Sequence, residues 1–151
     1  MRLLALAALP FSVVALAGCT GSDVDVELVW AGPPDADPGG VVSVNGFATY
    51  QNEVEEHWER SAAMTAAEFL RLDERTASRT TIESRAEPGE GSGPSTVTVT
   101  LAGLLDDSVR AERWRLGFQQ RGEVYALTAA LREQRCHRGR GHSGFSPEPC
   151  A

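Results

Sequence analysis

The chain has 151 residues, of which 42 % are hydrophobic and 23 % are charged, and its formal net charge at neutral pH is −7. This length and composition are typical of one globular domain. All 14 basic residues are arginine and they form no basic stripe along the sequence. This argues against a nucleic-acid partner, because neutralised phosphates supply most of the affinity of such proteins.

The first 18 residues have the three parts of an export signal. Arg2 provides the positive end, residues 3–17 form an apolar run, and the small residues Ala17 and Gly18 precede Cys19. The run has 15 residues, fewer than the roughly 20 that span a bilayer, so we expect residues 1–18 to be a cleaved signal peptide.

Residues 16–19, Leu-Ala-Gly-Cys, resemble the lipobox of bacterial lipoproteins. The resemblance implies that Cys19 is acylated, with chains such as palmitate, and becomes the first residue of the mature protein. Residues 19–22 would then be the lipidated cysteine and a short tether, and two or more acyl chains would anchor the protein stably. The expected location is the extracytoplasmic face of the bacterial cell membrane. The alternative is an ordinary secretory signal that ends before a cysteine.

Residues 23–44 are expected to contain one strand and one loop. Residues 23–30, DVDVELVW, alternate acidic and apolar side chains, which predicts a half-buried strand. Its apolar face would hold Val24, Val26, Leu28 and Trp30. Residues 31–40, AGPPDADPGG, predict a loop because they are rich in proline and glycine. They are alternatively a flexible spacer, in which case the compact domain begins near Val41.

The segment from Asn45 to about Glu74 has helical spacing, with Asn45 as candidate N-cap. A break at Arg60-Ser61 would give two shorter helices. The expected core stripe consists of Phe47, Tyr50, Val54, Trp58, Met64, Ala67, Phe69 and Leu70.

Four later segments predict strands, over residues 76–87, 95–101, 109–118 and 123–131, with a turn at residues 105–108. In the third of these segments, Arg113 and Arg115 alternate with apolar residues on the opposite face. In the fourth, the pattern places Tyr125, Leu127, Ala129 and Leu131 on one face. The predicted fold class is α+β: one N-terminal helix or two short helices, packed on a curved antiparallel sheet of 3–5 strands, over a compact domain at residues 45–151. This element order resembles the NTF2-like and cystatin-like folds.

Cys136 and Cys150 bracket a C-terminal loop, RCHRGRGHSGFSPEPC from residue 135. In an exported chain such a pair predicts a disulfide, here closing residues 136–150. A loop of this length would stabilise the fold by roughly 3 kcal/mol in the chain-entropy model. Phe145 is the expected apolar plug beneath the loop. A structural zinc site of Cys136, His137, His142 and Cys150 is the rival, but the ligand order lacks two closely spaced pairs, and we expect no metal.

The same loop is a candidate anion site. Residues 135–151 carry three arginines and one acid, whereas residues 19–134 carry ten arginines and 20 acids. Arginine pairs bidentately with phosphate or carboxylate, and histidine adds a pH-dependent donor. The candidate ligands are Arg135, Arg138, Arg140 and His142. The sequence favours a simpler interpretation, in which these arginines pair with the protein's own carboxylates, such as Glu112, Asp106 or Asp107.

The tail and the preceding VTVTLAGLLDDSVRAERW resemble a group of small bacterial lipoproteins that end in a cysteine-bracketed GRGH loop. The resemblance extends over about residues 45–151. It implies lipid anchoring and an extracytoplasmic domain, and it implies no activity or catalytic residue.

The sequence contains no GxSxG, HExxH or P-loop motif, and the pair Asp106-Asp107 lies in a turn signal. We therefore expect a non-catalytic binding or envelope-interaction module without a cofactor. Its partners would be the bilayer, through Cys19, and an envelope protein or a small anionic ligand. One alternative is an NTF2-like pocket that binds or transforms a small molecule. Another is recognition of a glycan, phosphate or headgroup by the arginine loop.

Overall fold

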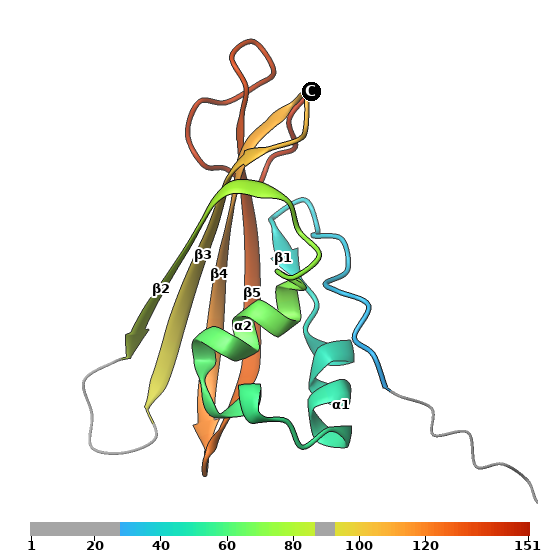
Figure 1. Ribbon diagram of the computed structural model, residues 1–151. Coiled ribbons are helices and arrows are strands. Elements are labelled where there is room, and N and C mark those ends of the chain that lie inside the picture. The colour runs from blue at the N-terminus through green and yellow to red at the C-terminus, as the bar shows by residue number, and fades with distance from the viewer. Residues whose placement is uncertain (1–27, 87–92) are drawn as a thin grey trace, which may run out of the picture.

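Two short α-helices lie against one face of an antiparallel sheet in the computed structural model, which describes residues 28–86 and 93–151 (Figure 1). The strands are β1 (Val41–Val42), β2 (Ala77–Ala86), β3 (Pro94–Leu104), β4 (Val109–Arg121) and β5 (Val124–Cys136). Their order across the sheet is β1-β5-β4-β3-β2, and the sheet stays open. The predicted α+β class is confirmed.

The helical segment is divided into α1 (Asn45–Glu53), a 3-10 turn η1 (His57–Arg60) and α2 (Ala62–Leu70). The predicted break at Arg60-Ser61 is present, and Ser61 caps α2 through a hydrogen bond from the Met64 amide. A second break follows Glu53, so Glu55 and Glu56 lie outside any α-helix. Asn45 is the first residue of α1 and not its N-cap, because the cap position is Val44.

The strand predicted at residues 23–30 is not found where the structure describes this segment. Residues 23–27 lie outside the described residues, and residues 28–30 have no regular structure. The Trp30 ring packs against Phe47, Tyr50 and Phe69, and its Nε1 donates to the Phe69 carbonyl at 2.8 Å. Trp30 therefore packs in the helical layer and does not pair with a strand, because the helices offer its indole both an aromatic cluster and a hydrogen-bond acceptor.

Residues 31–40 form a loop that lies against the sheet. Ala36 packs on the core, and the Gly40 carbonyl accepts a hydrogen bond from the Arg132 amide at 2.7 Å. Gly40 has φ of +82°, and a Cβ there would come within 2.5 Å of the Arg132 carbonyl. This close approach of loop and β5 requires glycine.

The core fills the space between the helices and the inner face of the sheet, which is the face that the helices cover. Phe47 and Phe69 from the helices meet Trp114, Leu116 and other apolar side chains of the sheet, all nearly inaccessible to solvent. Most of the predicted helical stripe is therefore core, but the Met64 side chain is exposed.

A β-bulge in β5 changes which of its residues face the core. Gly117 pairs with Ala129 whereas Phe118 pairs with Leu127, so Thr128 is the extra residue. Leu127 and Ala130 are buried and Ala129 is exposed, which makes the predicted common face of Tyr125, Leu127, Ala129 and Leu131 wrong. The bulge also places Glu133 on the outer face, the face away from the helices.

Candidate functional site

The C-terminal loop is closed by a disulfide between Cys136 and Cys150, whose Cα atoms lie 5.4 Å apart, as the sequence predicted. The returning chain also pairs with β5, because the backbone groups of Gln134 and Ser146 exchange hydrogen bonds of 2.7 and 2.9 Å. The loop is therefore fixed both by a covalent bond and by an extension of the sheet.

The His142 ring holds this loop through contacts with two of its backbone carbonyls. Its Nδ1 lies 2.8 Å from the Gly144 carbonyl and its Nε2 lies 2.8 Å from the Glu148 carbonyl. Both partners only accept hydrogen bonds, so the two contacts are made together only by the doubly protonated ring. These backbone hydrogen bonds raise the pKa of His142 above its ordinary value. The predicted anion ligand His142 thus has both ring nitrogens engaged within its own loop.

The candidate zinc ligands are brought together only in part. Ligand atoms of Cys136, His142 and Cys150 lie within 4.8 Å of one another, but His137 is exposed and is not part of this cluster. While the two sulfurs are bonded to each other, neither offers the thiolate that zinc requires.

Arg138 and Arg140 are exposed, and neither forms an ion pair with any acidic residue in the described part of the chain. The Asp106 carboxylate instead accepts the amides of Ser108 and Val109 at 2.7 and 2.6 Å, and these hydrogen bonds lower its pKa. The interpretation that the loop arginines pair with the protein's own carboxylates is wrong for the residues described.

The Glu112 carboxylate likewise pairs with arginines outside the C-terminal loop. Its carboxylate, almost buried on the inner face, accepts hydrogen bonds from Arg75 Nη1 at 3.0 Å, from Trp114 Nε1 at 3.2 Å and from Arg132 Nη2. Both guanidinium groups also stack over the Trp114 ring. This cluster satisfies the buried charge and holds the end of the sheet to the segment after α2.

Phe145 and Arg135 connect the loop to the outer face of the sheet. The guanidinium carbon of Arg113 lies 4.4 Å from the centre of the Phe145 ring, and that of Arg135 lies 5.0 Å from it. Phe145 is half-buried beneath the loop, and its ring makes cation–π contacts with both Arg113 and Arg135.

The outer face collects arginines from three strands. Arg121, at the end of β4, alternates to the same side but lines a separate cleft with Ala48 and Gln51 of α1. The pairing register places on the rest of the outer face Arg79, Arg85, Arg113, Arg115 and Arg135, together with Glu83 and Glu133. We call these seven residues the arginine face. Their formal charge is +3, whereas residues 19–151 together carry −8. The net charge of this face, on the side of the sheet opposite the helices, is thus opposite in sign to that of the protein as a whole.

Glu133 fixes two of these arginines. Its side chain is 9 % exposed, and its two oxygens accept from Arg113 Nε at 2.9 Å and Arg115 Nη2 at 3.1 Å. Arg115 remains 49 % exposed. Each guanidinium keeps further N–H groups that are not used by Glu133, so the pair is positioned in advance for an anion.

A cleft of about 560 Å³ lies on the arginine face, lined by Glu83, Arg85, Ala86, Thr96, Thr98, Arg113 and Arg115. Guanidinium and hydroxyl groups supply several hydrogen-bond donors, and they lie in rows set by the strand spacing. The chemistry suits an elongated ligand with phosphate or carboxylate groups.

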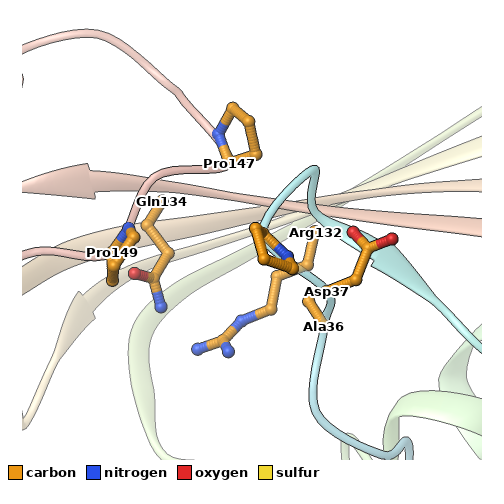
Figure 2. A pocket seen from close by; sticks show the side chains of 7 residues that line it. Ala36, Asp37, Arg132, Gln134, Pro147 and Pro149 are labelled. Atoms are coloured by element: carbon orange, nitrogen blue, oxygen red, sulfur yellow. The ribbon is translucent and has the colours of Figure 1, made fainter.

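A second cleft, of about 300 Å³, lies between β5, the 31–40 loop and the end of the C-terminal loop. Figure 2 shows the side chains of Arg132 and Gln134 pointing into the space between Pro149 and Ala36, while the Asp37 carboxylate points away. Asp37 is engaged with the amides of Gly39 and Val41. No sequence signal indicated this cleft, because it joins three segments distant in sequence.

No helix among the described residues is long and apolar enough to cross a membrane. Comparison of the chain with protein families, curated proteins and solved structures finds no match. The likeness to NTF2-like and cystatin-like folds thus rests on element order, and the lipoprotein resemblance rests on residues 16–19 and the tail.

Proposed function

We propose that this chain is a lipid-anchored, extracytoplasmic, non-catalytic binding module, and that its arginine face binds an anionic envelope molecule through phosphate or carboxylate groups. The observation that carries the ligand class is the gathering of five arginines on one face of an acidic protein, where two are fixed by a nearly buried glutamate. Arg138 and Arg140 extend this charge into the adjacent loop.

The anchoring part of the proposal is supported by the export signal and by Cys19 at its end. The disulfide supports an oxidising compartment. Metabolic labelling with palmitate tests the anchor: the full chain should incorporate the label and Cys19→Ser should not. Label in the Cys19→Ser chain, or none in either, would contradict it.

The ligand part is tested with a soluble form beginning at Thr20 and two double variants of equal net charge. Arg85→Gln/Arg115→Gln removes arginines that line the cleft but leaves Arg113 on Glu133. Arg60→Gln/Arg121→Gln removes exposed arginines that do not line it. We expect the first variant to bind an anionic polysaccharide, and vesicles rich in phosphatidylglycerol, at least about tenfold more weakly than the second. Equal binding by both variants would show that affinity depends only on the net charge of the protein, and would contradict a binding site at the arginine face.

The two probes distinguish the sources of the anionic groups. Preference for the polysaccharide over the vesicles would indicate an envelope glycan, and the reverse would indicate lipid headgroups. Vesicles of phosphatidylcholine alone are the neutral control. No binding of the unsubstituted protein to either anionic probe would refute the proposed ligand class.

The cleft in Figure 2 supports a second candidate function, binding of a small acid. Proline and alanine walls with a guanidinium and a carboxamide on one side are typical of a site for a small ligand with one polar end. A panel of small carboxylates, screened by thermal shift, should stabilise the protein, and Gln134→Leu should remove that effect. No stabilisation by any member would contradict this candidate.

A further inference from the structure

Strand β2 forms one edge of the sheet. Among the described residues, no strand lies beside it on the side away from β3 (Figure 1). Its residues from Ser78 to Ala86 are all exposed. The other edge is different, because β1 and the bridge from Ser146 cover β5 near Ala130, Leu131 and Gln134. Within residues 28–86 and 93–151, β2 therefore presents one long row of backbone donors and acceptors that no strand covers, which is a template for another strand.

The charges on β2 restrict what can pair with it. Arg79 and Glu83 lie on the outer face, two residues on either side of Thr81. If a second β2 pairs antiparallel about a two-fold axis at Thr81, each Arg79 lies directly opposite a Glu83 of the other copy. Directly opposite residues on one face have Cβ atoms about 5 Å apart, so both pairs attract.

The neighbouring symmetric registers are less favourable. A two-fold axis at Thr80 would place Arg79 opposite Thr81 and leave Glu83 opposite Ala77, so no opposite charges would face each other. An axis at Ile82 would place Arg79 opposite Arg85, and like charges directly opposite destabilise a sheet. With the axis at Thr81, Arg85 lies opposite Ala77. The Ile82 side chains of the two copies, each 42 % exposed in one chain, become diagonal neighbours on the inner face.

We propose that β2 is a homodimer interface, in which two copies pair antiparallel about Thr81 and form one continuous ten-stranded sheet. The two-fold axis of such a pairing is normal to the sheet, so both arginine faces lie on the same side. The inference rests on β2 alone and does not depend on the proposed ligand.

The test is a charge-swap cycle on the full-length chain, which is purified in a density-matched detergent. Sedimentation equilibrium then measures the dimer dissociation constant of each variant. The unsubstituted chain should be a dimer in equilibrium with monomer. Arg79→Glu and Glu83→Arg should each raise the dimer dissociation constant by about tenfold or more, because two attractive pairs become two repulsive pairs. The double variant Arg79→Glu/Glu83→Arg should restore the original constant.

Arg85→Glu is the matched control, since it makes the same charge change on the same face of the same strand. In the proposed register it faces Ala77 and should leave the dissociation constant nearly unchanged. A monomer at every concentration would overturn the proposal. So would a dimer that both single swaps leave intact, or a double variant that remains monomeric although its circular dichroism spectrum shows a folded sheet.

Discussion

Arg113 of β4 and Glu133 of β5 lie directly opposite each other on the outer face, with Nε 2.9 Å from Oε2. The other glutamate oxygen accepts from Arg115 at 3.1 Å. One nearly buried carboxylate therefore sets the positions of two arginines that line the 560 Å³ cleft.

Glu133→Gln should lower the free energy of unfolding by about 1–2 kcal/mol, because two charge-assisted hydrogen bonds are weakened at a site whose arginines remain partly solvated. The midpoint of urea unfolding measures this change. Glu55→Gln, which changes an exposed glutamate with no ion pair among the described residues, is the control and should change stability by less than about 0.5 kcal/mol. Equal midpoints for the two variants would mean that Glu133 does not hold the arginines.

Replacing both cysteines, Cys136→Ser/Cys150→Ser, should destabilise the fold by roughly 3 kcal/mol, since a 15-residue loop is no longer closed in the unfolded chain. Urea unfolding of this variant should match that of the original protein in a reducing buffer. A variant as stable as the oxidised protein would contradict the structural role of the bridge.

His142 should make stability depend on pH. Its folded pKa is raised, so its contribution is fully present below the ordinary value near 6.5 and is lost as the pH rises through the folded pKa. The melting temperature should therefore fall above about pH 6.5, and His142→Gln should flatten that part of the profile. Identical profiles for the His142→Gln variant and the original protein would refute the role assigned to the ring.

Arg138→Ala/Arg140→Ala should change the free energy of unfolding by less than about 0.5 kcal/mol, because neither side chain has an ion-pair partner among the described residues. The same variant should bind the anionic polysaccharide more weakly if these arginines extend the arginine face. Thermal unfolding and binding are measured on one preparation. A large loss of stability would mean that the loop arginines hold the protein's own acids after all.

The sequence predicted the β3 and β4 faces because their alternation is regular. Val97, Val99 and Leu101 are buried, and Arg113 and Arg115 lie on the face opposite Trp114, as the period of two requires. It failed in β5, where the bulge at Thr128 shifts the period by one residue. No local pattern marks this bulge.

The arginine face could not be predicted from the sequence, because its members come from β2, β4 and β5 and meet only through the strand register. The sequence indicated the cationic loop, where Arg135, Arg138 and Arg140 are close along the chain. It missed Glu133, whose position depends on the bulge. Trp30 was misassigned for a related reason, since its partners Phe47 and Phe69 are distant in sequence.

NMR of the arginine Nε–H resonances during addition of the anionic polysaccharide tests whether the arginine face is the binding surface that we propose. We expect the signals of Arg85, Arg113 and Arg115 to shift and saturate together, while those of Arg60 and Arg121 stay in place. Uniform small shifts of all arginines, or shifts confined to residues outside the arginine face, would contradict this proposal.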